Sequence, residues 1–246
     1  MVSSARSAPT IESDRRAAER WHADRNRHRT MSIVSLHLRP GLYHRRIGGD
    51  HIFFDLPADR YFLLPPHLRA AFDSYLNGTP SAPALSEFLA AGLIGPGQAE
   101  DSPTPLAFTH AVESLVDGPL GAASTLQILR AIWMQGRARA ELRRDGILDI
   151  VARLERDRPR NASCDERVIQ NIAAAFLHSR RLVSAADQCL VRGIAMKRML
   201  AQRGCDARLV FGVTMPFSAH CWVQASDVVL TDTLDIIRRY QPIFAV

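Results

Sequence analysis

The sequence predicts an α+β protein in which a small β-then-α unit precedes a larger unit of helices and antiparallel strands. Three observations support this prediction. Short strand patterns followed by two helix patterns fill residues 31–95. A stretch dense in Gly and Pro, residues 96–105, has the composition of a linker. Residues 106–246 then show helical periodicity first and strand alternation near the C-terminus.

Composition limits the class of protein without choosing a partner. A length of 246 residues allows one large or two small domains, and 47% hydrophobic residues suffice for packed cores. The net charge of +6 comes mainly from arginine and suits an acidic partner, although solubility or an arginine-rich genome explains it equally well. No apolar run approaches the ~18 residues of a membrane span. Residues 1–30 lack an apolar signal segment, so we expect a disordered extension on a cytoplasmic protein.

The N-terminal unit reads as strands followed by helices. Gly48-Gly49-Asp50 is a turn signal between two apolar runs, and Pro65-Pro66 marks the change to helical spacing. The predicted strands are residues 34–38, 43–47, 51–56 and 61–64, and the predicted helices are residues 67–76 and 84–91.

The C-terminal unit reads as helices followed by a small sheet. Residues 106–155 are predicted to be mostly helical, with a break at Gly118-Pro119. Ser184 and Asp187 have the spacing of a capping box, which predicts the start of a helix that ends near Gly204. The other predicted elements are a helix at residues 165–177 and strands at residues 207–213, 216–224 and 228–233.

Three residues near the C-terminus could form a nucleophile, a base and an orienting carboxylate. Cys189 lies near the first turn of a predicted helix, where the helix dipole lowers the pKa of a thiol. His220 and Asp232 lie on successive strands, and a three-residue loop at 225–227 would place them directly opposite each other, about 5 Å apart. This order predicts cysteine-based acyl chemistry.

Alternatives remain open at this stage. Cys164 and Cys221 compete as nucleophiles, although strand alternation points the Cys221 side chain away from the His220 face. Asp235 competes as the orienting carboxylate. Cys189 could also be an ordinary core residue. The four cysteines, which include Cys205, show no CxxC spacing, so neither a zinc site nor a disulfide framework is predicted.

Several C-terminal stretches resemble a known family. They are Asp187-Gln188-Cys189-Leu190-Val191-Arg192, residues 203–213, Pro216-Phe217-Ser218-Ala219-His220-Cys221-Trp222-Val223, Asp232 and Tyr240-Gln241-Pro242-Ile243. Together they resemble the lasso-peptide B proteins, which are transglutaminase-like (papain-like) cysteine proteases that remove the leader from a ribosomally made precursor. The likeness is strong over residues 180–246 and loose from about residue 106. Cys221 departs from the family, which usually has a small residue such as Ala there, and the hairpin turn lacks Gly.

The resemblance extends to the N-terminal unit. Residues 31–95 resemble the winged-helix-like, PqqD-like domain that recognises the leader in this family, here fused to the protease. The resemblance implies that the leader adds as a strand beside residues 51–56 or a neighbouring strand, facing the helix at 84–91. DNA binding is disfavoured because that helix contains Glu87 and no Lys or Arg. The implied leader contacts are Ile52, Phe53, Phe54, Leu85 and Phe88.

The resemblance also implies a function. Cys189 would attack the peptide bond at the leader–core junction, His220 would act as base and then acid, and Asp232 would orient His220. The implied partners are the precursor peptide and an asparagine-synthetase-like cyclase, with no nucleic acid or membrane. No cofactor is expected in this chain, and any ATP dependence would come through the cyclase. The alternatives are a transglutaminase-like amidase or acyltransferase with the same triad, and a non-catalytic peptide-binding chaperone.

Overall fold

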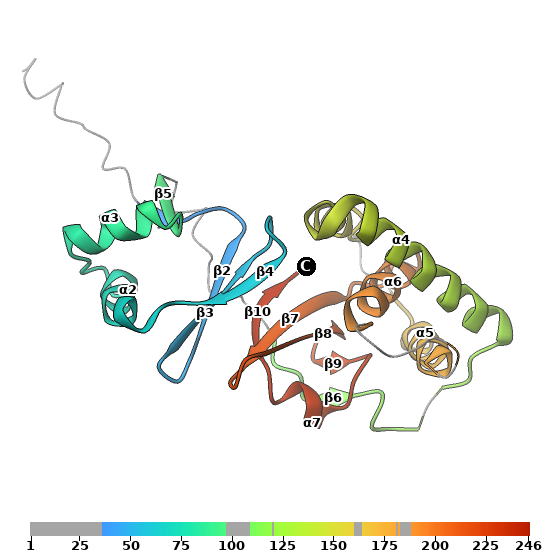
Figure 1. Ribbon diagram of the computed structural model, residues 1–246. Helices are drawn as coiled ribbons and strands as arrows, with labels where there is room; N and C mark the ends of the chain where they lie inside the picture. The colour runs from blue at the N-terminus through green and yellow to red at the C-terminus, as the bar shows by residue number, and fades with distance from the viewer. Residues whose placement is uncertain (1–35, 97–108, 120, 160–163, 181, 183–187) are drawn as a thin grey trace, which may run out of the picture.

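The computed structural model describes residues 36–96, 109–119, 121–159, 164–180, 182 and 188–246 (Figure 1). The predicted extension at residues 1–30 and most of the predicted linker lie outside these residues. Pro96, predicted to belong to the linker, is instead the last residue of a strand. The predicted α+β class is confirmed, whereas the winged-helix-like assignment of the N-terminal unit stays a prediction.

The N-terminal part pairs a three-stranded antiparallel sheet, in the order β2-β3-β4, with two helices. One face of this sheet and the two helices enclose a core that contains Phe53, Phe72 and Phe88. A separate antiparallel pair joins β1 to β5. The elements are β1 (Leu36–Leu38), β2 (Leu42–Ile47), β3 (Asp50–Asp55), β4 (Arg60–Leu63), a 3₁₀ turn (Pro66–Leu68), α2 (Arg69–Leu76), α3 (Ala82–Ala90) and β5 (Ile94–Pro96).

The C-terminal part packs three long helices against one face of a five-stranded sheet in the order β10-β7-β8-β9-β6 (Figure 1). Its strands are antiparallel except for the parallel pair β6 and β9. The elements are β6 (Glu113–Ser114), α4 (Thr125–Arg156), α5 (Glu166–Ser179), α6 (Cys189–Ala201), β7 (Arg208–Thr214), β8 (Ser218–Ala225), β9 (Val228–Val229), α7 (Leu234–Ile237) and β10 (Gln241–Ala245).

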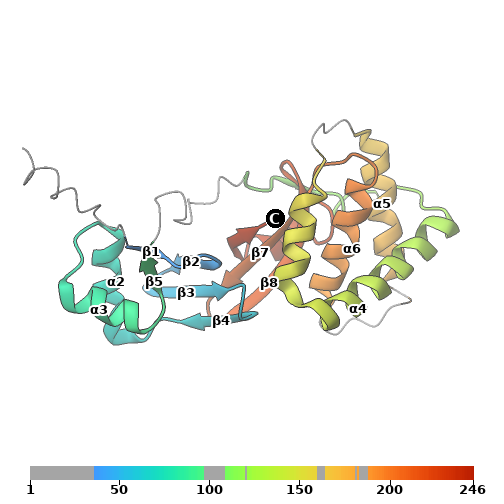
Figure 2. The ribbon, with the colours of Figure 1, turned by 90° about the horizontal axis from the view of Figure 1, so that it is seen from above.

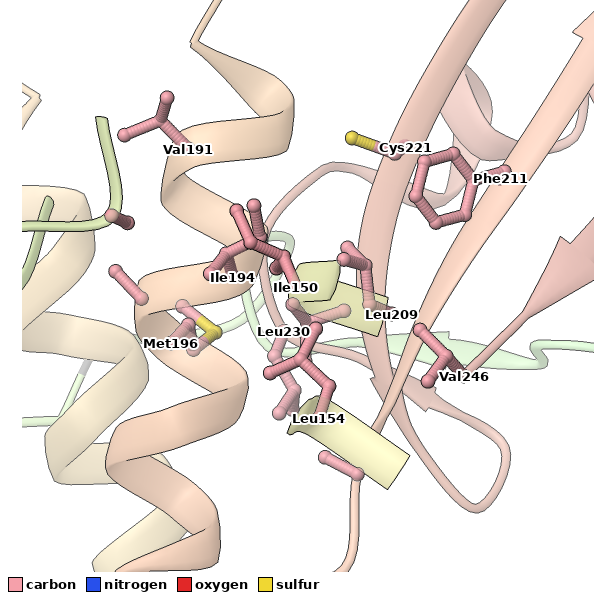
Figure 3. Packing of buried hydrophobic residues seen from close by; sticks show 14 of the residues in the cluster. Ile150, Leu154, Val191, Ile194, Met196, Leu209, Phe211, Cys221, Leu230 and Val246 are labelled. Atoms are coloured by element: carbon pink, nitrogen blue, oxygen red, sulfur yellow. The ribbon is translucent and has the colours of Figure 1, made fainter. Parts of the chain in front are cut away.

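The two sheets lie side by side, with α2 and α3 beyond the first and α4–α6 beyond the second (Figure 2). Ile52 and Phe54 of β3 belong to the same apolar cluster as residues of α4–α6 and β7, whereas Phe53 belongs to the cluster of the N-terminal helices. Figure 3 shows the part of this larger cluster that lies between the helices and the sheet. The Phe54 ring stacks 5.4 Å from Phe211, and the Arg45 Nε donates a hydrogen bond of 2.6 Å to the Pro242 carbonyl. Both faces of β3 are therefore buried.

The start of the C-terminal part differs from the sequence prediction. Residues 109–119 and 121–124 are not helical, and they contribute β6 to the edge of the sheet. Helix α4 begins only at Thr125, where Ser124 and Gln127 form a reciprocal capping box. Gly118, Pro119 and Gly121 explain why helix formation is suppressed before this cap.

The hairpin register also differs from the prediction. Gln224 pairs with Val229 and Ala225 with Val228, so the turn contains two residues rather than three. Ser226 occupies the left-handed region at φ 51°, which such a tight turn requires. The pairing is therefore shifted by one residue, and β9 ends at Val229, before Asp232.

Gly212 offers a test of this packing. A Cβ at Gly212 would lie 2.6 Å from a ring carbon of Trp222 and 3.0 Å from the Tyr240 Cβ. The Trp222 ring is fully buried and has no room to move away. We expect Gly212→Ala to lower the free energy of unfolding by about 1–3 kcal/mol, measured by urea denaturation. In α4, a Cβ at Gly136 would meet open space, so Gly136→Ala is the control and should raise stability by about 1 kcal/mol. Equal stability of both variants would contradict this account.

Candidate active site

Cys189 is the first residue of α6, at the open end of the helix. Its N-cap is Gln188, with backbone angles φ −102° and ψ 0°, and no side chain caps the helix among the described residues. The predicted capping pair Ser184 and Asp187 lies outside these residues. Cys189, which is partly exposed, thus lies at the positive end of the α6 dipole, where negative charge is favoured.

His220 of β8 lies between Cys189 and Asp232. The His220 Nε2 is 3.4 Å from the Asp232 Oδ2, a distance typical of an ion pair rather than a well-formed hydrogen bond. His220 also lies close enough to Cys189 to lower the pKa of the thiol. The structure thus brings together the three predicted residues.

The contact between His220 and Asp232 does not arise from strand pairing. Because β9 ends at Val229, Asp232 lies in the bend that follows. The Ser114 hydroxyl of β6 donates 2.6 Å to the Asp232 carbonyl, and the Thr231 Oγ1 accepts 3.1 Å from the Val223 N–H. Two side-chain hydrogen bonds thus hold the bend that presents the carboxylate.

Charge stabilises a thiolate at Cys189. The interaction with the Cys221 thiol lowers the pKa of Cys189 more than any other, whereas burial raises this pKa. With further help from His220 and the Cys221 N–H, these contacts lower the pKa of Cys189 to about 4. Cys189 is therefore negatively charged at neutral pH.

The imidazole carries the matching positive charge. Burial alone would lower the pKa of His220, but the interactions with Asp232 and Cys189 outweigh it and raise the pKa to about 10. Burial would likewise raise the pKa of Asp232, whereas His220, Thr231 and Arg180 keep that pKa below its ordinary value. At neutral pH the site therefore contains the Cys189 thiolate, the His220 imidazolium and the Asp232 carboxylate.

Two arginines near the carboxylate are not predicted by the sequence patterns. The Arg180 Nη2 is 3.6 Å from the Asp232 Oδ1, on the side of the carboxylate not used by His220. Arg192 is buried nearby, and burial together with the positive charge of Arg180 lowers its pKa. The position of Arg192, three residues after Cys189 on one helix face, is the signal that could have identified it.

The rival residues are placed differently. Cys221 is almost completely buried, and its hydrogen bond to Cys189, followed by burial, raises its pKa well above the ordinary value. Cys164 and Cys205 form a disulfide with a Cα–Cα distance of 4.8 Å. The expectation that no disulfide is present is thus wrong, because the fold joins cysteines 41 residues apart. Asp235 is exposed in α7, whereas Asp232 makes the ion pair with His220.

The predicted leader contacts lie mostly inside the protein. Ile52, Phe53, Phe54 and Phe88 are at most 1% exposed, because β3 and α3 turn these side chains into the two cores. In this conformation they are core residues rather than a peptide-binding surface. Leu85 is half-buried beside the N-terminal core. Residues 51–56 are also not an edge, because β3 is the central strand of its sheet.

Within the part of the chain that the structure describes, no three side chains of the metal-binding types gather at one place. Across those same residues, every helix lacks the combination of length and apolarity needed to cross a bilayer.

Comparisons with known proteins agree with this geometry. Residues 132–245 match the family described as the transglutaminase-like superfamily. The microcin J25-processing protein McjB of Escherichia coli is 47% identical over 47 residues, which are 19% of this chain and 23% of McjB. The match thus spans less than a quarter of that relative, and no solved structure matches the chain. Residues 132–245 are therefore a transglutaminase-like domain, and both matches support the resemblance of the chain to the lasso-peptide B proteins.

Proposed function

We propose that this protein is a cysteine peptidase that removes the leader from a ribosomally made lasso-peptide precursor. The position of Cys189 at the start of α6, beside a His220 that is paired with Asp232 at 3.4 Å, is the observation that carries the proposal. The transglutaminase-like match supports cysteine chemistry, and the likeness to a microcin-processing protein supports a precursor peptide as substrate.

In the proposed reaction, the Cys189 sulfur attacks the carbonyl carbon of the peptide bond between leader and core. The oxygen that gains negative charge accepts a hydrogen bond from the Cys189 N–H at the start of α6. His220 gives its proton to the leaving amine, and Asp232 holds the imidazole in the orientation that this transfer needs. Water, deprotonated by His220, then hydrolyses the thioester and frees Cys189.

The leader is proposed to bind as an added strand on β4 rather than on β3. Among the described residues β4 pairs with β3 alone, so its outer edge is available for main-chain hydrogen bonds. The Tyr61 ring of β4 stacks 4.5 Å from Phe54 and lies 5.8 Å from the exposed Phe217 ring. Burial raises the pKa of Tyr61, and the negative charge of Cys189 raises it further. This edge of β4 therefore lies within electrostatic range of Cys189.

The remaining parts of the proposal concern partners and location. We propose that the protein acts in the cytoplasm with an asparagine-synthetase-like cyclase, which closes the ring and consumes the ATP. The chain itself is proposed to need no cofactor, because the thiolate and imidazolium supply the groups that peptide cleavage requires.

The function is tested by incubating the purified protein with the precursor encoded beside its gene and measuring product masses. We expect one cut at the leader–core junction. A peptide that consists of the leader alone should not be cut. Transfer of the acyl group to an added amine in place of water would favour the alternative of an acyltransferase. Unchanged precursor, both alone and with the cyclase and ATP, would leave a peptide-binding chaperone as the better explanation.

The ion pair predicts a broad pH optimum. We expect kcat/KM to be nearly constant between pH of about 4 and about 10. Protonation of Cys189 below its pKa removes the nucleophile, and deprotonation of His220 above its pKa removes the proton for the leaving amine. The profile is measured at constant ionic strength beside the ultraviolet absorbance of the thiolate. An acidic limb near the ordinary thiol pKa of about 8.5 would contradict the ion pair.

A further inference from the structure

A second thiol, Cys221, interacts with Cys189 and forms no bond to the substrate in the proposed cleavage. Strand alternation in β8 sends the Cys221 side chain to the face covered by α6, opposite the face that carries Trp222. The Cys221 sulfur points from β8 toward α6 (Figure 3). Both cysteines are free thiols, Cys189 partly exposed and Cys221 buried. A solvent-accessible sulfur thus has a sheltered sulfur beside it.

The two cysteines pack in the same apolar cluster and interact with each other. Cys221 is the largest influence that lowers the pKa of Cys189, and Cys189 in turn raises the pKa of Cys221. The contact polarises the pair, because Cys189 carries the negative charge and Cys221 retains its proton. A reactive thiolate next to a second thiol that can resolve its oxidised form is the arrangement found at reversible redox sites.

We propose that Cys189 and Cys221 form an oxidation site that reacts with a hydroperoxide and closes a reversible disulfide. In the first step, the Cys189 thiolate attacks one peroxide oxygen and the O–O bond breaks. Sulfur is oxidised to a sulfenic acid, and the peroxide is reduced to an alkoxide or hydroxide. In the second step, the Cys221 sulfur attacks the Cys189 sulfur and the S–O bond breaks. The Cys221 proton leaves with that oxygen as water.

This chemistry gives Cys221 a role that packing alone does not require. A small apolar residue such as Ala would pack at this position without supplying a thiol. With Cys221 present, a peroxide drives Cys189 into a disulfide that a dithiol can reduce. Without it, the sulfenic acid is open to irreversible oxidation to the sulfinic acid. The Cys164–Cys205 pair is a separate disulfide with different partners.

The test treats the full-length protein and its Cys221→Ser variant with hydrogen peroxide and follows intact mass and peptide maps. For the wild type we expect a loss of about 2 Da and a Cys189–Cys221 cross-linked peptide, which the map separates from Cys164–Cys205. Dithiothreitol should restore iodoacetamide labelling of Cys189 to its untreated level. In Cys221→Ser we expect gains of oxygen at Cys189 instead, with labelling mostly lost after reduction. The readout needs no peptide substrate, so it is independent of the proposed cleavage.

Two results would overturn the proposal. One is oxygen addition at Cys189 of the wild type without a cross-link to Cys221. The other is equal recovery of labelling in wild type and variant. Thermal unfolding checks that the variant is folded, and Cys221→Ala replaces it if the serine variant is not. The wild-type peptide map decides the question by itself if neither variant folds.

Discussion

Replacement of Cys189 by alanine is expected to lower the rate of precursor cleavage by at least about 10⁴-fold. The change removes the sulfur that forms the thioester but leaves His220, Asp232 and the N–H groups of α6 in place. The binding site proposed along β4 is also untouched, so the loss should appear in kcat while the affinity for the precursor stays within a few-fold. Single-turnover cleavage and binding of a labelled leader measure the two quantities separately.

Two controls make the Cys189 result specific. Thermal unfolding of Cys189→Ala should resemble that of the wild type, because the thiol is partly exposed and fills no core cavity. Cys189→Ser keeps the size of the side chain and should be nearly as inactive, since a hydroxyl has a far higher pKa than a thiol. Cleavage that survives in both variants would place the nucleophile elsewhere. Cys221 would then be tested next, because Cys164 and Cys205 are joined to each other.

Local patterns of apolar residues in the sequence predicted the helices and strands that hold the candidate site. An apolar run between two turn signals identified β3, strand alternation identified β8, and helical periodicity identified α5 and α6. The placement of Cys189, His220 and Asp232 on a helix start and successive C-terminal segments was likewise available from residue types and spacing. These features depend mostly on residues that are close together in the chain.

Long-range features could not be predicted in the same way. The hairpin was expected to have a three-residue loop, since no Gly marked the position of positive φ that Ser226 actually occupies. The segment before α4 was predicted to be helical, and nothing local showed that Ser114 would hydrogen-bond to Asp232, 118 residues later. Ile52 and Phe54 looked available for a peptide because the contact of β3 with a second sheet is not encoded near β3 itself.

His220 and Asp232 illustrate the difference between a correct contact and its correct cause. Direct cross-strand pairing would have required a register one residue away from the observed one. The carboxylate reaches the imidazole because β9 is short and the following bend is held by Ser114 and Thr231. A change in the hairpin turn is therefore less damaging to the ion pair than the loss of the side chains that hold the bend.

Asp232→Asn is expected to lower kcat/KM by about 10³-fold or more. The amide keeps the size of the carboxylate but removes the charge that stabilises the His220 imidazolium, so the pKa of His220 falls from about 10. The alkaline limb of the pH profile should therefore move to lower pH, a shift that a purely structural defect would not produce. The amide also removes one of the negative charges near the buried Arg192, so some loss of stability is expected and is measured by thermal unfolding.

Asp235→Asn is the matched control, because Asp235 lies three residues on and is exposed in α7. It should retain wild-type kcat/KM and an unshifted alkaline limb. If Asp235→Asn instead reproduced the defect while Asp232→Asn stayed active, the orienting carboxylate would be Asp235, and α7 would have to turn it toward His220 during the reaction. If Asp232→Asn lost activity with no change in the alkaline limb, the carboxylate would act by holding the bend rather than by charging the imidazole.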